Sequence, residues 1–321
     1  MDLIYMNANR EDVNVLHEYE LDLAFGKDEN NFECKVDSNQ HCCQEGFFLY
    51  FEGTEYGGRI EKIASDTESG EVTYSGDTWH GILDSKILEP DTGEDYLVLS
   101  GEANAVLATL ITRMDLQDLF TVSAEDSGIT IKSYQMNRYI GGYSGIQKML
   151  KASGAKLKLV FRMGMVELAA VPLADYTRDE QFDSDSVPLK IKRNYKPVNH
   201  LICLGKGELK DRTVIHLYAD KEGNISRTQS LFGIEEKTKT FDYPSVESEE
   251  ELITKGTERL KEYQNTDEVK MGFSPDEDAY DIGDIVGAAD VVTGLEVATD
   301  ITKKIVTVKK GETKISYKVG E

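Results

Sequence analysis

Hydrophobic and polar positions alternate with a period of two in short runs along the first hundred residues. Gly- and Asp-rich turns, such as Ser69-Gly70, separate these runs, and each run has the length of a β-strand. Closely spaced short strands predict a barrel or sandwich over residues 1–100. The predicted strands are FFLYF (47–51), GGRIEKIASD (57–66), EVTYSGDTW (71–79) and YLVLS (96–100).

After residue 101 the period changes to that of amphipathic helices. The apolar side chains of EANAVLATLITRMDLQDLF (102–120) recur every three or four positions, and RYIGGYSGIQKMLKASG (138–154) repeats the pattern before Gly154. A strand, GITIKSYQ (128–135), lies between the two helices, and KLKLVFRM (156–163) is expected to pair with GMVELAAV (164–171). Residues 101–181 therefore read as a compact α+β unit.

Strands resume after the polar stretch 175–186, in KIKRNY, NHLICLGKG and DRTVIHLYAD. A helix follows near residues 245–270, because Ser248 and Glu251 have the spacing of a capping box. From Tyr280 the chain reads as a meander, with turns at Thr293-Gly294 and Gly311-Glu312. Its predicted strands are IGDIV, AADVV, LEVATD, KIVTVKK and KISYKVG.

Together these patterns predict a β-rich α+β fold with two tandem β-barrel-like domains, an α+β insertion and a helical insertion. The expected domains are an N-terminal barrel over 1–100, the α+β domain over 101–181, and a second barrel over 182–321. We expect Trp79 to pack inside the first barrel, because it is large, apolar and flanked by strand residues.

The composition argues against some classes of partner. The chain has 36 Lys and Arg but 59 Asp and Glu, for a formal net charge of −23. Nucleic acids and anionic membranes attract basic surfaces, so specific nucleic-acid binding and stable membrane insertion are both disfavoured. The nearby basic residues Lys151, Lys156, Lys158 and Arg162 are expected to form a solvated strand-and-helix surface.

The cysteine pattern and the N-terminus suggest a chain that folds in a reducing cytoplasm. Cys34, Cys42, Cys43 and Cys203 match no disulfide framework, and adjacent Cys42 and Cys43 are not expected to bridge each other easily. The opening MDLIYMNANRED has neither the basic region nor the long apolar region of a signal peptide. No stretch approaches the roughly 20 apolar residues of a membrane span.

Phosphate-binding and serine-nucleophile motifs are both incomplete. In RYIGGYSGIQK, Gly145 is followed by Ile146 and Gln147 rather than by the Lys-Ser/Thr of a P-loop. The same loop has Ile146 where a nucleophile elbow around Ser144 requires glycine. At Gly205-Lys206-Gly207 the dinucleotide-binding fingerprint fails, because its last glycine position is Lys210. An ordinary strand-to-helix turn is the expectation for the first loop.

No spacing typical of a metal site is complete. Cys34, His41, Cys42 and Cys43 lack the paired C-x₂₋₄-C knuckles of structural zinc sites, so buried, inert cysteines are expected. The histidines His17, His80, His200 and His216 lack H-E-x-x-H or H-x-H partners, and we expect them to be structural. We therefore predict no metal and no cofactor.

The segment FSPDEDAYDIGDIVG (273–287) holds five acids: Asp276, Glu277, Asp278, Asp281 and Asp284. An EF-hand register from Asp276 or Asp278 fails, because Tyr280 occupies a position that needs an oxygen ligand. A pair of catalytic carboxylates stays open, since such partners are close in space and not in sequence. We interpret the segment as the exit from the helical insertion, with Gly283-Asp284 as the turn into the last barrel.

Several phrases, taken together, resemble one known family. Residues 55–90, with Tyr56-Gly57-Gly58 and the run from Tyr74 to Leu83, are similar to the N-terminal barrel of siphophage tail-hub (tail-associated or baseplate hub) proteins. This family is related in fold to the central hub of contractile phage tails. SLFGIEEK (230–237) before an acidic helix, and Tyr280 to Val286 before the terminal meander, resemble the second half of the family pattern.

The resemblance implies a structural subunit, not an enzyme, in a phage or prophage tail. It implies a homotrimeric ring of two barrels per chain at the tail tip, assembled in the bacterial cytoplasm. Its implied partners are the distal tail or tube protein, the tape-measure protein, and a tail fibre or receptor-binding protein. It carries over no catalytic residues. The alternatives are a hydrolase of cell-wall or surface polysaccharide, and a secretion-spike-like binding module of the same fold lineage.

Overall fold

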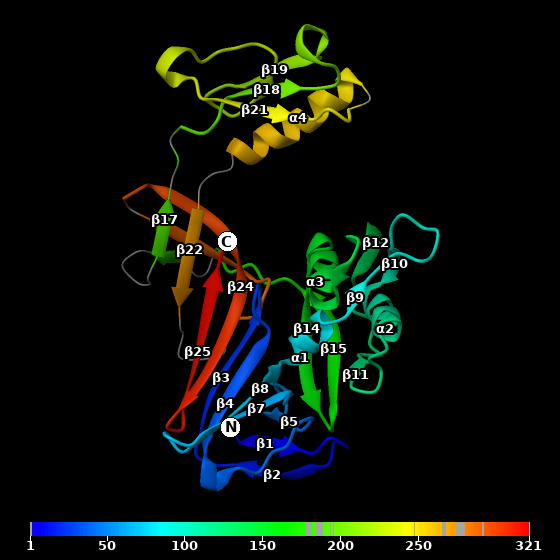
Figure 1. Cartoon of the computed structure of the whole chain (residues 1–321), viewed down its shortest axis with the longest axis vertical. Helices are drawn as coiled ribbons and strands as arrows, with labels where there is room; N and C mark the ends of the chain where they lie inside the picture. Colours follow the sequence, from blue (N-terminus) through cyan, green and yellow to red (C-terminus); the bar gives the residue numbers. More distant parts are fainter. Residues whose placement is uncertain are drawn as a thin grey trace. The chain divides into compact units, whose positions relative to one another are not determined.

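The chain divides into two compact units that are described separately here. The first comprises residues 1–189 and 270–321, and the second comprises residues 190–269. The computed structural model (Figure 1) describes residues 2–177, 181–183, 189–192, 194, 196–246, 248–264, 268–273, 280–290 and 292–320.

A ten-stranded sheet is the framework of the first unit. Its main path runs β17-β22-β25-β24-β3-β4-β8-β7, and β23 joins β24 to β16 away from this path. The bounds are β3 (Tyr19–Gly26), β4 (Asn31–Asp37), β7 (Lys62–Asp66), β8 (Glu71–Asp77), β16 (Gln181–Asp183), β17 (Leu189–Lys192), β22 (Glu268–Phe273), β23 (Ile285–Asp290), β24 (Leu295–Lys309) and β25 (Glu312–Val319).

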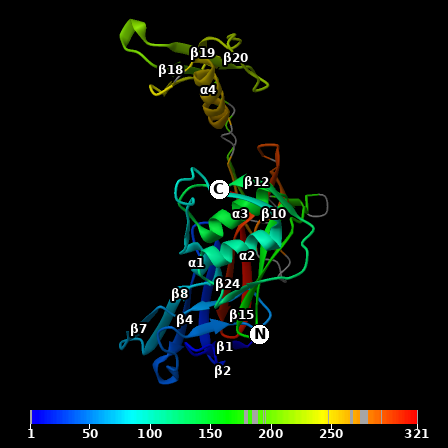
Figure 2. The ribbon, with the colours of Figure 1, turned by 90° about the vertical axis from the view of Figure 1, so that its right-hand side faces the viewer.

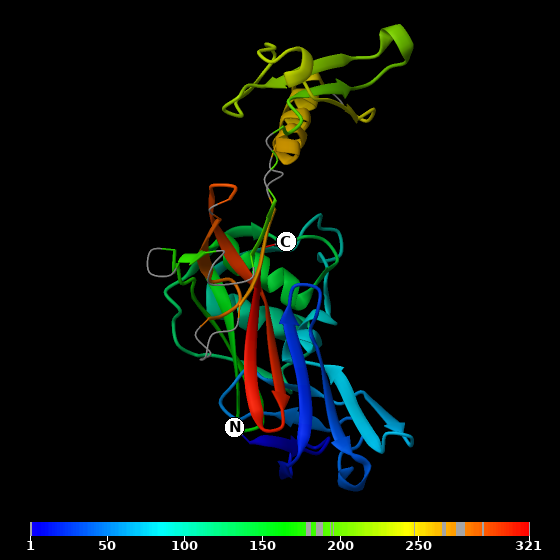
Figure 3. The same ribbon diagram turned by 90° about the vertical axis from the view of Figure 1, so that its left-hand side faces the viewer.

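The main sheet contains strands from both the N-terminal and the C-terminal part of the chain. On one side β24 pairs antiparallel with β3, with Val306 opposite Leu23, and on the other side it pairs with β25. Figure 3 shows the N-terminal strands in blue beside the C-terminal strands in red. The predicted β-rich α+β class is confirmed. However, the described strands form no closed barrel, and strands assigned to two tandem barrels instead share one sheet.

Four smaller sheets and three helices complete the first unit. One sheet has the order β2-β1-β5-β6 and another β11-β15-β14, while β10 pairs with β12 and β13 with β9. The strands are β1 (Leu3–Met6), β2 (Asp12–Leu16), β5 (Phe48–Tyr50), β6 (Gly57–Arg59), β9 (Ile87–Leu88), β10 (Val98–Glu102), β11 (Phe120–Val122), β12 (Thr130–Gln135), β13 (Ile140–Gly141), β14 (Ala155–Arg162) and β15 (Met165–Pro172). The helices are α1 (Trp79–Asp84), α2 (Ala103–Arg113) and α3 (Gly142–Ala152), with a 3₁₀ turn at Ser38–Gln40.

One hydrophobic core lies beneath these helices and crosses the domain boundary expected at residue 100. Met6, Phe48 and Trp79 pack in the same buried cluster as Leu107 of α2 and Phe161 of β14. Figure 2 shows α1, α2 and α3 gathered in one region of the unit. Segments on both sides of residue 100 thus share a core, and the expected domain bounds at residues 100 and 181 stay a prediction.

The second unit is a four-stranded sheet with one helix. The strand order is β20-β19-β18-β21, and α4 packs over β18 and β19. Leu201, Cys203, Ile215 and Leu217 face Leu252 and Leu260 of the helix in a core of their own. The elements are β18 (His200–Leu204), β19 (Val214–Ala219), β20 (Ile225–Ser226), β21 (Thr238–Asp242) and α4 (Glu249–Gln264), with 3₁₀ turns at Leu209–Asp211 and Gly233–Glu235.

Most elements follow the hydrophobic pattern, with several exceptions. The predicted strand 57–66 is two strands, β6 and β7, and the predicted strands IGDIV and AADVV overlap the single strand β23. The predicted strand 71–79 ends at Asp77, because the Thr78 hydroxyl accepts the Gly81 N–H and caps the short helix α1. The predicted strands LEVATD and KIVTVKK are a single strand, β24, of 15 residues. Across the described residues, none of the helices is both long and apolar enough to span a bilayer.

Candidate functional site

The acidic segment near residue 280 contributes a buried ion pair. Asp284 is 1% exposed, and its carboxylate lies 2.7 Å from the Lys156 ammonium and accepts the Ala174 N–H. Asp281 also pairs with Lys156, at 2.7 Å. The predicted turn at Gly283 is present, but Asp276, Glu277 and Asp278 lie outside the described residues. Asp281 and Asp284 thus form ion pairs with Lys156, which was expected on a solvated surface.

The prediction that Lys156 lies on a solvated basic surface is wrong. Its side chain is 9% exposed. Burial alone would lower its pKa, but Asp281 and Asp284 raise the pKa above the usual value. Lys151 instead lies at the surface and pairs with Asp300 at 2.8 Å. The alternation in KLKLVFRM predicts that Lys156 faces solvent. In the structure the loop before β23 covers Lys156, and a local pattern gives no information about a contact between segments so far apart in the sequence.

A second buried charge cluster joins β24 to the start of β6 and to α1. Lys304 is 1% exposed, and its ammonium lies 2.8 Å from a carboxylate oxygen of Glu55. The other oxygen of Glu55 is 3.6 Å from His80 Nε2. The rings of Tyr56 and Tyr317 lie 5.3 and 5.5 Å from the ammonium, close enough for cation–π contact.

The charge states in this cluster follow from its burial. Burial would raise the pKa of Glu55, but Lys304 and His80 hold it at about 2. Burial lowers the pKa of His80 more than Glu55 raises it, so the ring is neutral at pH 7. His80 stacks on Phe25 at 4.0 Å and is 1% exposed. These groups are enclosed by aromatic side chains, and the cluster serves as a structural link between strands.

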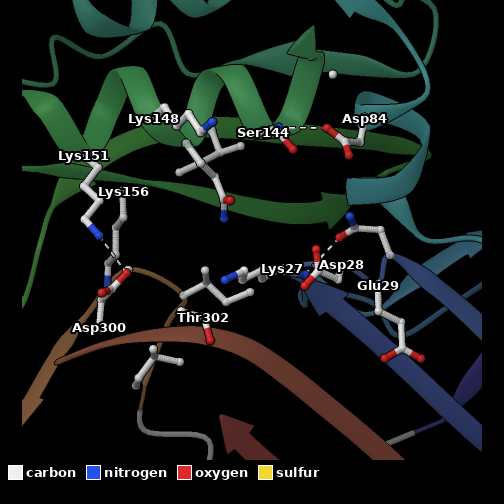
Figure 4. A pocket seen from close by; sticks show the side chains of 18 of the residues that line it. Lys27, Asp28, Glu29, Asp84, Ser144, Lys148, Lys151, Lys156, Asp300 and Thr302 are labelled. Carbon is white, nitrogen blue, oxygen red and sulfur yellow. Dashed lines mark hydrogen bonds and ion pairs between the residues drawn. The ribbon is translucent and has the colours of Figure 1, made fainter. Parts of the chain in front are cut away.

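A polar groove of about 1140 Å³ opens between α3, the β3–β4 loop and β24 (Figure 4). Small-molecule pockets typically enclose roughly 300–1,000 Å³ and are mostly apolar. This groove carries charged side chains of both signs beside apolar ones such as Ile140 and Leu157. Its charged lining includes Lys27, Asp28, Glu29, Asp84, Lys148, Lys151 and Asp300.

The glycine-rich loop at the edge of this groove starts helix α3, as expected. The Ser144 N–H donates to Asp84 at 2.9 Å, so a carboxylate from α1 caps the helix (Figure 4). A Cβ on Gly142 would lie 2.4 Å from the Met114 sulfur and 2.5 Å from the Leu83 carbonyl oxygen. The glycine therefore allows close packing of α3. Gly205-Lys206-Gly207, the other candidate, connects β18 to β19 and precedes no α-helix.

Two histidines that look isolated in the sequence meet in the second unit. His200 Nε2 lies 2.8 Å from His216 Nδ1, and His200 Nδ1 lies 2.5 Å from the Glu236 carboxylate. His200 also stacks on Tyr218 at 4.4 Å. Because β18 and β19 are antiparallel with Ile202 opposite His216, the two rings share one face of the sheet. Only the strand register brings the two histidines together. Their separation of sixteen residues in the sequence therefore did not predict that they would be in contact.

The cysteines do not form a metal site. Throughout the described parts of the chain, no three His, Cys, Asp or Glu side chains are arranged to hold a metal ion. Cys34, Cys43 and Cys203 are buried and Cys42 is exposed, all as free thiols. His41 contacts the Tyr74 hydroxyl at 2.9 Å through Nδ1, and His17 is exposed.

Comparison with known proteins identifies the fold. No family model matches the sequence, and no curated protein matches it. Among solved structures, the tail protein from Neisseria meningitidis MC58 is 10% identical with a TM-score of 0.52, and the match covers 100% of this chain and 96% of that one. Prophage tail protein gp18 from Listeria monocytogenes EGD-e is 13% identical with a TM-score of 0.52, covering 99% and 94% of the two chains.

A third neighbour is the 43 kDa tail protein of prophage MuSo2 from Shewanella oneidensis. It is 10% identical, with a TM-score of 0.56, and the match covers 99% of this chain and 98% of that one. The three matches each extend over both units, and at such low identity they speak to fold alone. The resemblance drawn from the sequence is thereby confirmed at the level of structure: the chain has the fold of phage tail proteins.

Proposed function

We propose that this protein is a structural subunit of a phage or prophage tail, located at the tail tip or baseplate hub. Copies would form a ring that joins the tail tube to the receptor-binding or lytic tip. The observation that carries this proposal is the match in fold to three tail proteins over 99–100% of the chain. The sequence phrases around Tyr56-Gly57-Gly58 point to the same family independently.

The charged clusters support a non-catalytic role. Asp284 with Lys156, and Glu55 with Lys304, are carboxylate–lysine pairs in the first unit, and the Asp284 and Lys304 side chains are each 1% exposed. Catalytic acids need access to substrate and a pKa near the working pH. Glu55, with a pKa of about 2, lacks that property. Each pair joins segments that are far apart in the sequence.

The oligomeric state tests the ring. Purified protein is expected to give the mass of a homotrimer by native mass spectrometry and light scattering, and negative-stain images should show a threefold ring with a central channel. The same measurements at low and high salt separate a specific ring from charge-driven association, because salt screens exposed charges. A monomer at every concentration and salt would contradict the proposed ring.

Two further measurements test the role and the location. We expect no clearing of peptidoglycan or bacterial surface polysaccharide in a zymogram, and clearing by purified protein would favour the hydrolase instead. Antibody against the chain should label intact particles at the distal end of the tail. Label on the head or along the tube would contradict a tip position. Cross-linking within particles would identify the neighbours, for which tube, tape-measure and receptor-binding proteins are the proposed candidates.

A further inference from the structure

The vicinal cysteines Cys42 and Cys43 have no part in the proposed assembly role, yet their surroundings are specific. Their sulfur atoms lie 3.8 Å apart. Cys42 is exposed, whereas Cys43 is completely buried. Two thiols this close, one of them open to solvent, combine access for an oxidant with a nearby second sulfur. Cys203, by contrast, is buried.

The backbone around the pair is held by one buried side chain. The Tyr74 hydroxyl accepts the N–H of Cys42 at 3.1 Å and the N–H of Cys43 at 3.3 Å. Tyr74 is fully buried in β8, so the two residues are anchored to the main sheet. The anchor fixes the backbone of the dipeptide, and adjacency in the chain gives each thiol a high effective concentration at the other.

A third thiol, that of Cys34, lies beneath this loop. Cys34 is the direct cross-strand neighbour of Tyr74 and is fully buried. Burial raises the pKa of Cys34 to about 12, and burial also raises the pKa of Cys43. Both buried groups are therefore thiols rather than thiolates at neutral pH, and the exposed Cys42 is the sulfur that an oxidant in solution reaches first.

We propose that Cys42 and Cys43 form an oxidation-sensitive pair that closes into a reversible disulfide within its own dipeptide. A hydroperoxide supplies the oxidising equivalents. The Cys42 sulfur attacks the peroxide, the O–O bond breaks, and Cys42 sulfenic acid forms with release of water or an alcohol. The Cys43 thiol then gives its proton to the departing hydroxide as its sulfur attacks the Cys42 sulfur, the S–OH bond breaks, and a second water leaves. Two thiols lose two electrons and two protons, and a thiol reductant reverses the reaction.

Closure requires a local change at Tyr74. The sulfurs must approach from 3.8 Å to the roughly 2.05 Å of a disulfide bond, and the ring includes the Cys42–Cys43 peptide. The Cys43 N–H belongs to that peptide, so its hydrogen bond to Tyr74 must shift. The reduced pair is compatible with the anchor, whereas the oxidised pair alters the contact between this loop and β8.

Peptide mapping of the intact protein tests the proposal, because trypsin separates the three thiols. Residues 36–59 contain Cys42 and Cys43 with no internal Lys or Arg, and residues 28–35 contain Cys34. The protein is treated with hydrogen peroxide under native conditions, alkylated after denaturation and digested. We expect the unalkylated peptide 36–59 lighter by two hydrogen atoms, fully alkylatable after dithiothreitol, while Cys34 is alkylated throughout.

Several results would overturn the proposal. A peptide 28–35 linked to 36–59 would assign the disulfide to Cys34, and two linked copies of 36–59 would show a bond between molecules. Irreversible sulfinic acid on Cys42, or two alkylated cysteines after peroxide, would show that no bond closes. As matched variants, Cys34→Ser should keep the disulfide. Cys42→Ser, which changes an exposed side chain, should leave Cys43 reduced.

Discussion

At the residue scale, the burial of Trp79 could be predicted from the sequence, but the residues that surround it could not. The expected burial is confirmed, since Trp79 is 0% exposed. However, its ring stacks on Phe161 of β14 at 5.1 Å and lies 6.0 Å from Phe48, so it packs in a core shared with the α+β segment and not inside a barrel. Nothing in the neighbouring sequence indicates Phe161 as its partner.

Trp79→Ala is expected to lower the free energy of unfolding by about 3–5 kcal/mol, because it leaves a large cavity in a closed core. Urea unfolding of the full chain, followed by circular dichroism, measures the change. Trp79→Phe is the matched control, which keeps an aromatic ring and should cost clearly less. An unchanged midpoint for Trp79→Ala would show that the ring is not buried in solution.

The Glu55–Lys304 pair predicts a specific acid sensitivity. The pKa of Glu55 is about 2 in the folded chain against an ordinary value of 4.5. A lowered carboxyl pKa stabilises the fold above pH 4.5, and this contribution is lost as the pH falls from about 4.5 to about 2. Over that window, the loss at this one group is about 3 kcal/mol. Unfolding free energies measured at steps of pH test it.

Glu55→Gln is the matched variant for this pH series. At pH 7 it should be less stable than the wild type, because the ion pair between Glu55 and the buried Lys304 is lost. Between pH 4.5 and 2 its stability should fall less steeply than that of the wild type. Parallel pH curves for the two proteins would contradict the role assigned to the pair. The pKa of Glu102 is also lowered to about 2, because its hydrogen bonds outweigh the effect of burial. Glu102 is present in both proteins, so it contributes equally to both pH curves.

At the scale of elements, local patterns predicted helices and hairpins well. Helices α2, α3 and α4 lie where the apolar spacing and the caps placed them, and the Ser248 hydroxyl accepts the Glu251 N–H at 3.1 Å. The hairpin of β14 and β15 is paired as expected. Short helix α1 was missed, because Thr78 ends the strand through a cap that alternation does not reveal.

At the close approach of β8 to the end of β6, the segment that resembles tail-hub proteins (55–90) has a glycine, Gly76. A Cβ on Gly76 would lie 2.0 Å from the Arg59 carbonyl oxygen, where β8 passes the end of β6. Gly76→Ala should therefore destabilise the first unit by about 1–3 kcal/mol or more, as overpacking does. Gly272→Ala is the control, since its Cβ would lie 3.7 Å from the nearest atom. Equal urea midpoints for the two variants would contradict this account.

At the scale of the whole molecule, the second unit is an insertion into the first. The chain leaves the main sheet along β17 and returns along β22, which are neighbours in that sheet and run in opposite directions in Figure 1. The segment between these two strands has its own core around Leu201 and Leu252. The sequence-based boundary at 182 instead assigns this segment to a barrel over 182–321.

Removing the inserted residues tests whether they form a separate unit or an integral part of a barrel over 182–321. Replacing residues 194–267 with a short Asn-Gly turn should leave a folded first unit, because the turn joins neighbouring antiparallel strands. Circular dichroism and a cooperative thermal transition are the measurements, with the full chain as reference. Loss of the cooperative transition would favour a single barrel over 182–321, in which these residues are integral.

The sequence by itself determined the β-rich class, the longer helices, the hairpin turns and the resemblance to tail-hub proteins, because period, caps and turn residues act between near neighbours. Only the tertiary structure decided that β3 pairs with β24, that Lys156 is buried against Asp284, and that His200 meets His216. These contacts join residues from 16 to about 280 positions apart, and their energies depend on strand register and burial. Neither quantity is written in a local pattern of polar and apolar positions.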